Sequence, residues 1–448
     1  MTDGCHIAVV GAGAAGLFAS IFAGQQSHDW ASVVAFDGAK RLGAKILIAG
    51  GGRCNVTHDV VSPADYASGP GSSNNAVKNV LRSFTVEQTV EFFRDRGVDL
   101  KREDTGKLFP TTDRARTVLN ALLEACYEAG VKLLTEHRVT EIERLGDGFR
   151  IATSQGEYYA QRVVLSTGGL ALPKTGSDGF GYELAKSLGH TVTETWPALV
   201  PLLLPPNHWL TALKGIAVDV ELSLAGPTGK VLRKQDGAML LTHFGLSGPA
   251  AMDISRHFRG HLGGFPVSPG LCPGAGVVID RPRAKPGANG PEVMLTANLM
   301  PQHTFESLES RLLEESRTHP RRTVLQVVQS QFPERLAVAL VQHGAGLEPG
   351  LLLSQLPKEG RRSLVRTLTA LPLPVIADRG YEFAEVTAGG VPLSEVNLST
   401  MESRVCPGLH LAGEILDVDG RIGGYNFQWA WCTGRLAGLG AAKNLTDE

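Results

Sequence analysis

Three glycines near the start of the chain have the spacing of a nucleotide-binding turn. Gly11, Gly13 and Gly16 form the pattern GxGxxG, directly after the apolar run Ile7 to Val10 and before small residues typical of a helix. The first glycine permits a tight turn, the second lets backbone N–H groups approach a pyrophosphate, and the third lets the helix pack on the strand. The pattern therefore predicts a strand, a turn and a helix that bind the diphosphate of a dinucleotide.

An acidic residue follows where such a turn requires one. Asp37 ends a second apolar run, VVAFD, 21 positions after Gly16. Its carboxylate can accept hydrogen bonds from the hydroxyls of an adenosine ribose, and its charge disfavours a 2′-phosphate. GxGxxG alone is often only a helix-capping turn, but the strand, the helix and the acid together predict NAD or FAD.

A second group of glycines bears on the choice between these two cofactors. The segment RLGAKILIAGGGRCNVTH, residues 41 to 58, shows neither strand nor helix periodicity and is predicted to be a long loop. It is not a P-loop, because no Gly-Lys-Ser/Thr follows the glycines. Consecutive glycines are costly to order. An extended glycine-rich segment would suit the ribityl-isoalloxazine half of FAD, and a solvated loop is the alternative.

The C-terminal seventy residues contain a second candidate site. LHLAGE is predicted to be a strand that delivers Gly413 and Glu414 to a cofactor-facing end, and GGYNFQWAWCTGRLAG a glycine turn that opens an apolar helix. A helix N-terminus carries about half a positive charge. Directed at the N1–C2=O edge of a flavin, it would stabilise the anionic reduced form. A purely structural final helix is the alternative, although it does not explain Glu414, Asp417 and Asp419 before the turn.

No residue is assigned as a catalytic acid or base. Cys54 beside Arg53 could be an activated thiolate, but a lone cysteine is more often a small packing residue. His243 could supply a proton, although a histidine that hydrogen-bonds within its own loop is more common. Lys45 and Arg53 are better explained as contacts to FAD phosphate or flavin O2. Tyr425 is expected to stack near the ring or to cap the helix.

Composition narrows the class of protein. The 448 residues predict two or three domains, and 43% hydrophobic residues indicate a globular protein with a substantial core. A formal net charge of −2 without long blocks of like charge gives no sign of nucleic-acid or membrane-surface binding. Six scattered cysteines argue against a zinc site or a disulfide framework. Without a signal peptide or an apolar run long enough to span a membrane, a cytoplasmic location is expected.

The order of the expected elements suggests one cofactor domain with an insertion. FTVEQTVEFFRDRG is predicted to be a helix with a Thr85/Gln88 capping box, and DRARTVLNALLEACYEAG a second helix that stops at Gly130. Strands joined by a Gly-Asp-Gly turn lead into Thr167 and Gly168. From Trp196 short strands predict an antiparallel sheet or barrel, followed by a Gly/Pro-rich connector (260–291) and a small helical group. No second GxGxxG precedes a helix, which argues against a separate pyridine-nucleotide domain.

These motifs together resemble one family, the BaiN-type NAD(P)/FAD-dependent oxidoreductases, which include conserved hypothetical flavoproteins and aminoacetone oxidase family enzymes. The family's motifs occur in order along nearly the whole chain: GAGAAG (11–16), GGGRCN (50–55), THFGLSGP (242–249), VTAGGV (386–391) and GLHLAGEILDVDGRIGGYN (408–426). The departures are small. His410 replaces the usual aromatic residue, and Arg421 and Ile422 stand where many members have Pro-Thr, beside the turn expected at the flavin edge.

The resemblance implies an α/β fold with a discontinuous, Rossmann-like FAD-binding domain of the glutathione-reductase type, residues 1–195 and 380–448. It also implies a β-rich, barrel-like insert (196–300 and 371–379) and a helical subdomain (301–370). The residues that it implies around FAD are Gly11, Gly13, Ala14, Ala15, Gly16, Asp37, Gly38, Arg41, Gly43, Lys45, Gly51, Gly52, Arg53, Cys54, Asn55, Val139, Thr167, Gly168, Gly413, Glu414, Asp419, Gly424, Tyr425, Asn426 and Phe427. No metal is expected.

The leading functional hypothesis is an FAD-dependent oxidoreductase. It would transfer hydride through flavin N5 between NAD(P)H or a reduced organic substrate and an acceptor, as an enone-type reductase or an amine oxidase-like enzyme. NAD(P)H would be a transient electron donor, the substrate a small molecule, and neither nucleic acid nor membrane a partner. The alternative is a flavin-binding RNA-modification or assembly factor without small-molecule turnover, against which the near-neutral charge argues weakly. An NAD-only dehydrogenase is a third hypothesis.

Overall fold

The computed structural model describes residues 3–27, 31–69, 72–259, 293–443 and 445, and the chain forms two units. Unit 1 consists of Met1–Pro197 and Glu385–Glu448, and unit 2 of Ala198–Ala384. The sequence places these boundaries at 195/196 and 379/380, and it divides the inserted part further into a β-rich and a helical subdomain. The predicted connector 260–291 lies outside the described residues.

Unit 1 is built on a mixed sheet in which the N-terminal strand is central. Ile7, Ala8 and Val9 are fully buried, as expected of a parallel strand covered on both faces. Parallel neighbours follow the order β22-β10-β1-β2-β7, and antiparallel strands β20, β21, β8 and β9 extend the sheet. The strands are β1 (Asp3–Val10), β2 (Val33–Phe36), β7 (Lys132–Leu134), β8 (Val139–Leu145), β9 (Gly148–Thr153), β10 (Gly156–Leu165), β20 (Val396–Asn397), β21 (Glu402–Ser403) and β22 (Leu409–Leu411).

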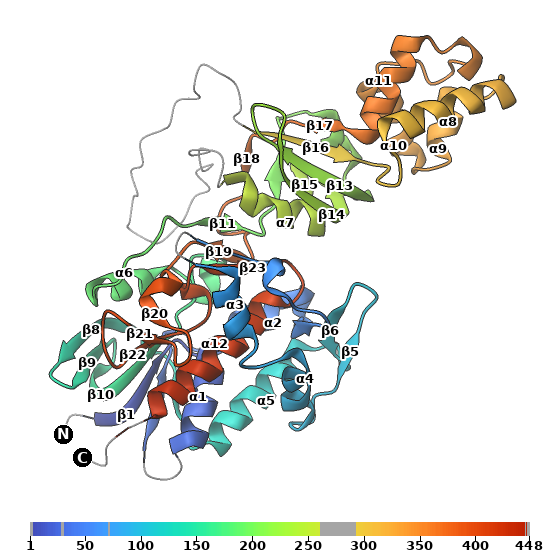
Figure 1. Ribbon diagram of the computed structural model, residues 1–448. Coiled ribbons are helices and arrows are strands. Elements are labelled where there is room, and N and C mark those ends of the chain that lie inside the picture. Colours follow the sequence, from blue (N-terminus) through green and yellow to red (C-terminus); the bar gives the residue numbers. More distant parts are fainter. Residues whose placement is uncertain (1–2, 28–30, 70–71, 260–292, 444, 446–448) are drawn as a thin grey trace. The chain divides into compact units, whose positions relative to one another are not determined.

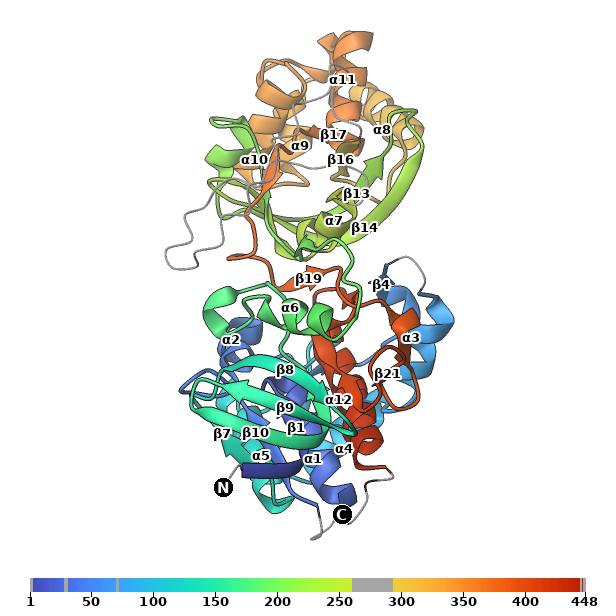
Figure 2. The same ribbon diagram turned by 90° about the vertical axis from the view of Figure 1, so that its left-hand side faces the viewer.

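Three helices lie side by side along one face of this sheet, α1 (Ala14–Ser27), α5 (Ala115–Glu128) and α12 (Tyr425–Ala442), as Figures 1 and 2 show. Two glycines let α12 approach α1 closely. A Cβ at Gly434 would lie 2.5 Å from the Ala15 carbonyl oxygen, and one at Gly438 would lie 2.2 Å from that of Ala19. The small residues of the last helix are therefore a packing seam.

The helices predicted between the first and last motifs are confirmed. Helix α4 (Val86–Arg94) begins at Thr85, whose side chain and that of Gln88 form the capping box. Helix α5 is followed by Gly130 at a φ of +68°. Unit 1 also contains α3 (Asn74–Leu81), α6 (Phe180–Ser187), a sheet of β3 (Thr57–His58), β6 (Lys107–Pro110) and β5 (Leu100–Arg102), and the pairs β4 (Tyr66–Ser68) with β23 (Val418–Gly420) and β11 (Trp196–Ala198) with β19 (Val386–Ala388).

The predicted long loop at 41–58 is wrong in its first part. Residues Ala44–Gly52 form helix α2, which is interrupted at Ala49, Gly50 and Gly51 by non-helical backbone angles. The regular part is too short to show a helical period. It is stabilised by packing, because Ile46 is buried and Gly43 lies against α5, where a Cβ would come within 2.5 Å of Leu119.

Unit 2 contains an antiparallel sheet in the order β17-β16-β13-β14-β15-β12-β18. The described pairings run as an open path from β17 to β18, so they do not confirm a barrel. Helix α7 (Gly248–Arg259) follows β15 directly. The strands are β12 (Leu202–Leu203), β13 (Ala217–Ala225), β14 (Val231–Leu241), β15 (Gly245–Ser247), β16 (Met294–Asn298), β17 (Leu371–Leu373) and β18 (Ala377–Asp378).

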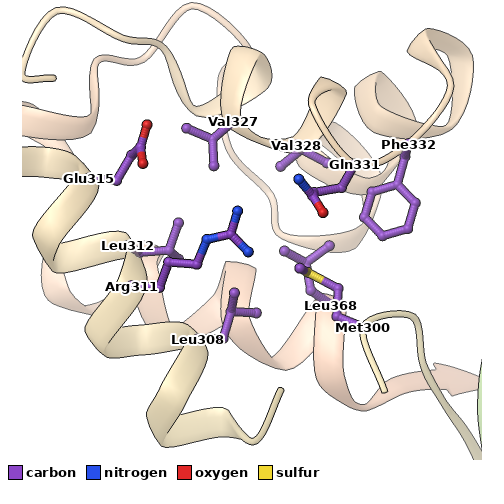
Figure 3. Close-up of a pocket in the computed structure, with 10 residues that line it drawn as sticks. All are labelled: Met300, Leu308, Arg311, Leu312, Glu315, Val327, Val328, Gln331, Phe332 and Leu368. Carbon is purple, nitrogen blue, oxygen red and sulfur yellow. The ribbon is translucent and has the colours of Figure 1, made fainter. Parts of the chain in front are cut away.

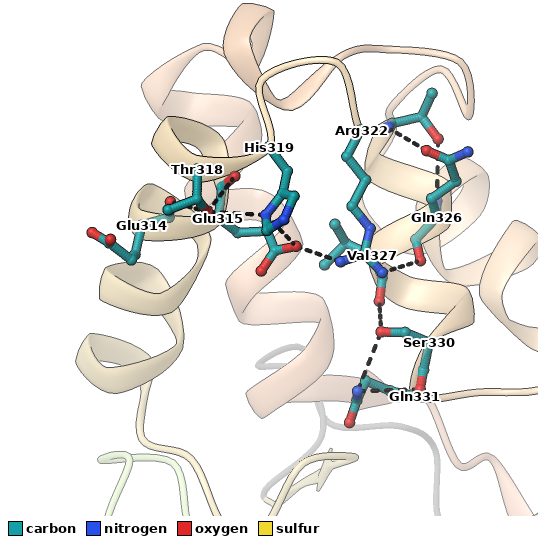
Figure 4. A network of polar contacts seen from close by, with 10 residues as sticks. Glu314, Glu315, Thr318, His319, Arg322, Gln326, Val327, Ser330 and Gln331 are labelled. Carbon is teal, nitrogen blue, oxygen red and sulfur yellow. Dashed lines mark hydrogen bonds and ion pairs between the residues drawn. The ribbon is translucent and has the colours of Figure 1, made fainter.

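The helical group of unit 2 consists of α8 (Phe305–Thr318), α9 (Val324–Gln329), α10 (Glu334–Ala339) and α11 (Lys358–Thr369). Glu315 of α8 binds the connection from α8 to α9, because it accepts from Arg322 and lies 3.5 Å from His319 Nδ1 (Figure 4). A cavity between the helices has mostly apolar walls, with Arg311 among them (Figure 3). Its volume of about 20 Å³ holds roughly one water molecule, so it is no cofactor site.

Within the described ranges, no helix is both long and apolar enough to cross a membrane. The same ranges contain no group of His, Cys, Asp and Glu side chains that could hold a metal ion.

Candidate cofactor-binding site

The strand register of unit 1 brings the predicted motifs to one edge of the sheet. Val10 pairs with both Phe36 and Leu165, and Leu165 pairs with Leu411. The segments that begin at Gly11, Asp37, Ser166 and Ala412 therefore leave the sheet in one row. Ligands of open α/β sheets bind outside the carboxyl ends of the strands, and this row is such a place.

The three fingerprint glycines have three different surroundings. Gly11 has a φ of +95°, and a Cβ there would lie 2.7 Å from the Ser166 carbonyl oxygen. A Cβ at Gly16 would lie 1.8 Å from the carbonyl oxygen of Gly11, whereas one at Gly13 would meet nothing within 4 Å. Gly11 and Gly16 are thus required by the fold, and Gly13 borders open space at the start of α1, as expected of the glycine that approaches a pyrophosphate.

Asp37 is fixed beside this turn. Its Oδ2 accepts from the Ala12 N–H at 2.9 Å, and its Oδ1 accepts from the Ala39 N–H at 2.8 Å. A carboxylate oxygen can accept more than one hydrogen bond, so both can still receive a ribose hydroxyl. Gly38 lies against Arg138, 3.1 Å from a Cβ, which places Val139 at the start of β8 close by. Arg41 is exposed.

Backbone angles and packing explain the triple glycine, and the space beside one of the three residues is open. Gly50, Gly51 and Gly52 have φ values of +57°, +70° and +86°. A Cβ at Gly50 would lie 2.8 Å from the Phe109 ring, so packing excludes a side chain there. A Cβ at Gly51 would meet nothing within 4 Å. Backbone angles require glycine at Gly51, and the space beside it is open.

Lys45 and Glu414 form an ion pair at this edge. Lys45 Nζ lies 2.5 Å from Glu414 Oε2, and Glu414 Oε1 accepts from the Thr387 N–H at 2.9 Å. Gly169 leaves room for this carboxylate, since a Cβ there would lie 2.9 Å from Oε1. The ammonium group predicted to contact FAD is thus held by an acid, and the acid is fixed from two sides.

Arg53 is also paired. Its Nη1 lies 2.6 Å from Glu103 Oε1 and 3.7 Å from Asp113 Oδ1, and its guanidinium carbon lies 4.0 Å from the centre of the Phe109 ring. These contacts direct Arg53 into an acidic cluster.

Cys54 is a packing residue and not an activated thiolate. It is fully buried, has a φ of +62°, and burial raises the pKa of its thiol to about 12. A thiol with such a pKa is protonated and unreactive at neutral pH.

Two buried polar atoms of the predicted site have no hydrogen-bond partner among the described residues, Asn55 Oδ1 and Thr167 Oγ1. Such atoms are rare in folded proteins and usually mark a missing water or ligand. Thr167 follows β10 in the row of strand ends, and Gly181 makes room for it, since a Cβ there would lie 1.8 Å from Oγ1. These two polar atoms and the open backbone at Gly13 fit a dinucleotide with a long polar linker such as FAD.

The neighbouring glycines of the row are also sterically required. Gly168 has a φ of +76°, and a Cβ there would lie 2.7 Å from Ser177 Oγ. Gly413 has a φ of +80° and faces the first turn of α1, where its Cβ would lie 2.8 Å from Ala15 Cβ. Ala14, the first residue of α1, and Ala15 thus lie between the glycine turn and the end of β22.

The turn before α12 is built by its own side chains. Asn426 Oδ1 accepts from the Gly420 N–H at 2.8 Å, and its Nδ2 donates to the Gly420 carbonyl at 3.0 Å. Gly424 has a φ of +96° and packs on the backbone of Thr57, 2.5 Å from a Cβ. Asp419 is buried on β23 in the same turn. Asn426 thus closes the turn, and the N-terminus of α12 follows it.

Aromatic residues of α12 pack inside unit 1. The Tyr425 ring stacks on His58 with 4.8 Å between centroids, and Phe427 stacks on Trp431 at 5.5 Å. Sequence reasoning missed Gln428, which is buried, accepts from Thr57 Oγ1 at 2.7 Å and donates to the Phe84 carbonyl at 2.7 Å. Its signal was an amide in the middle of an apolar helix.

Comparisons with known proteins agree with these motifs. The family model described as "HI0933-like protein Rossmann domain" matches residues 5–440. The chain is 33% identical over 439 residues to the 3-dehydro-bile acid delta(4,6)-reductase of Clostridium scindens, covering 98% of this chain and 99% of that protein. It is 33% identical over 425 residues to the ribosomal RNA dihydrouridine synthase of Escherichia coli, covering 94% of each.

Two further similarities are more distant. A ribosomal RNA dihydrouridine synthase of Haemophilus influenzae is 29% identical over 440 residues, covering 97% of this chain and 98% of that protein. Among solved structures, the 3-ketosteroid-delta4-(5alpha)-dehydrogenase of Rhodococcus jostii aligns over 99% of this chain and 97% of its own, with 17% identity and a TM-score of 0.49.

Proposed function

The chain belongs to the HI0933-like Rossmann family, a family of FAD-binding oxidoreductases, and on that premise we propose that it reduces a carbon–carbon double bond conjugated to a carbonyl group. The family assignment and the glycine turn with open space at Gly13 support FAD as the cofactor. NAD(P)H is proposed as the electron donor.

The observation that carries the reaction class is what the names of the relatives have in common. A delta(4,6)-reductase of a 3-dehydro bile acid acts on double bonds conjugated to a ketone, and a dihydrouridine synthase saturates a ring double bond of uracil, which is conjugated to a carbonyl. Both reactions saturate an electron-poor double bond, which takes up two hydrogens. This supports reduction over the amine oxidation that the sequence also allowed.

Different residues of unit 1 would bind different parts of the cofactor. The backbone at Gly13 and the N-terminus of α1 would bind the pyrophosphate, and Asp37 would accept the ribose hydroxyls. The open space at Gly51 would take the flavin half, and the N-terminus of α12 would stabilise negative charge at the pyrimidine edge of the ring. FAD bound there supplies two-electron hydride chemistry.

A second candidate differs in its acceptor, which would be a uracil base of ribosomal RNA. The names of the E. coli and H. influenzae relatives favour it. The formal net charge of −2 favours a small-molecule acceptor, because proteins that bind RNA through its phosphates are commonly basic.

A spectroscopic experiment tests the proposal. The purified protein should show a flavin spectrum, release FAD on denaturation, and lose its visible colour anaerobically with NADH or NADPH. Addition of a bile acid with a conjugated 3-keto group, or of ribosomal RNA, should restore the colour, and mass spectrometry should find a product that has gained two hydrogens. Absence of FAD, or a reduced enzyme that neither acceptor reoxidises, contradicts the proposal.

A further inference from the structure

A small sheet of unit 1 packs on the glycine turn that opens α12. Its strand β6 lies between β3 and β5, and Lys107 on β6 pairs with His58 on β3. Paired residues of neighbouring strands have their side chains on the same face. A Cβ at Gly423 would lie 3.4 Å from Lys107 Cε and 3.6 Å from His58 Cδ2. The face of the sheet that carries Lys107 and His58 therefore lies against this turn.

The same strand borders the triple glycine. Phe109 follows Lys107 by two residues, so their side chains point to the same face of β6. A Cβ at Gly50 would lie 2.8 Å from the Phe109 ring and 3.1 Å from the backbone nitrogen of Asn55. Asn55 is only 8% exposed, and its Oδ1 has no hydrogen-bond partner among the described residues. One face of β6 thus contacts both segments that are proposed to border the flavin, and a buried polar atom without a partner lies beside them.

Lys107 is a half-buried cation whose charge is not neutralised. Within the part of the chain that the structure describes, no oxygen accepts a hydrogen bond from its ammonium group and no carboxylate forms an ion pair with it. Two acids that belong to the same region are already paired. Asp59, which follows β3, accepts from Arg102. Glu103, which follows β5, accepts from Arg53 at 2.6 Å. The ammonium group of Lys107 is therefore free to contact a ligand at the turn.

We propose that the ammonium group of Lys107 contacts the N1–C2=O edge of the flavin and stabilises the negative charge that this edge gains on reduction. The inference rests on the proposed function, because it takes that edge to lie at the start of α12. A lysine ammonium is a compact point charge on a flexible stem, and its effect adds to the partial positive charge of the helix N-terminus. Lys45 and Arg53, the residues predicted for such a contact, are both paired with acids.

The midpoint potential of the bound FAD, measured anaerobically against a dye of known potential, tests this assignment without turnover. A positive charge at this edge stabilises the reduced flavin more than the oxidised one, so its removal should lower the potential. Loss of one charge-assisted hydrogen bond corresponds to about ten- to a hundred-fold, or roughly 30–60 mV for a two-electron couple. Sulfite is a second probe, because its addition to flavin N5 also places negative charge at N1–C2=O. Its dissociation constant, followed in the visible spectrum, should rise by the same factor.

Three variants separate the charge from the fold. Lys107→Met removes the charge and should change both values by these amounts, whereas Lys107→Arg keeps the charge and should restore each at least halfway to wild type. Lys132→Met is the matched control and should change neither value. Lys132 is an exposed lysine on β7, at the opposite end of the parallel strands from β22, on which α12 packs. Because Lys107→Met breaks no described ion pair or side-chain hydrogen bond, its apo-protein should unfold at the wild-type temperature.

Three results overturn the inference, namely a wild-type potential and sulfite affinity in Lys107→Met, equal changes in Lys107→Met and Lys132→Met, or no recovery in Lys107→Arg. In each case a wild-type protein that contains FAD and is reduced by NADH or NADPH leaves the flavin part of the proposed function standing. A protein without FAD contradicts the proposed function itself.

Discussion

Gly51→Val tests whether the open space beside the triple glycine belongs to the cofactor. Gly51 has a φ of +70°, and a Cβ there would meet no protein atom within 4 Å. Any loss in the apo-protein must therefore come from backbone strain, which is at least about 1–2 kcal/mol for a side chain in the left-handed region. If the flavin half of FAD fills this space, the valine methyl groups also collide with the ligand.

The chain contains a matched control for the strain. Gly97 has a φ of +71° and likewise nothing within 4 Å of a Cβ, but it lies at the end of α4. Gly97→Val and Gly51→Val should therefore lower the stability of the apo-protein by similar amounts. In a domain of this size 1 kcal/mol corresponds to roughly 2–4 °C in melting temperature.

The two variants should differ only toward FAD. Overpacking costs about 1–3 kcal/mol, which corresponds to roughly five- to a hundred-fold in affinity. Titration of each apo-protein with FAD, followed by flavin fluorescence, should show this loss for Gly51→Val and wild-type affinity for Gly97→Val. Equal FAD affinity in the two variants would refute the argument that the flavin lies against Gly51.

Three further predictions concern charged and buried groups. Glu414→Ala removes the acceptor of Lys45 and of the Thr387 N–H, so the free energy of unfolding of the apo-protein, measured by chemical denaturation, should fall by about 1–3 kcal/mol. Unchanged stability with weaker FAD binding would show instead that Glu414 contacts the ribityl chain. Cys54, whose pKa is raised to about 12 by burial, should resist iodoacetamide at pH 8 in the folded protein and react only after unfolding, which peptide mass spectrometry detects; labelling of the native protein would contradict this. Although burial opposes the shift, hydrogen bonds from Thr191 and His190 lower the pKa of Glu395 below its ordinary value. The ionised carboxylate therefore stabilises the fold fully above the pKa of the unfolded state, and this stabilisation is lost as the pH falls through the pKa of the folded state. Glu395→Gln should flatten the decline of stability between about pH 5 and 3, and an unchanged decline in that range would refute this.

Features set by local backbone chemistry were predictable from the sequence. The contact of Gly16 with Gly11, the Thr85/Gln88 capping box and the closure of the turn before α12 by Asn426 depend on interactions between residues close in the chain. The row of strand ends follows from the same pattern, because parallel strands expose their carboxyl ends at one edge.

Features set by distant partners were not predictable. Lys45 finds Glu414 369 residues away, and Arg53 finds Glu103 50 residues away, so nothing near either basic residue indicates its partner. Helix α2 escaped detection for the same reason. Its regular turn depends on packing between Gly43 and Leu119 of α5, which no periodicity within 44–52 could show.

The pairing of the basic side chains changes how the site must attract an anionic dinucleotide. Of the three basic residues predicted around FAD, Lys45 and Arg53 are neutralised by acids, and Arg41 is exposed. The favourable field for a diphosphate must then come mainly from backbone N–H groups at the start of α1. Gly13, where a Cβ would meet nothing within 4 Å, leaves this backbone open to a ligand.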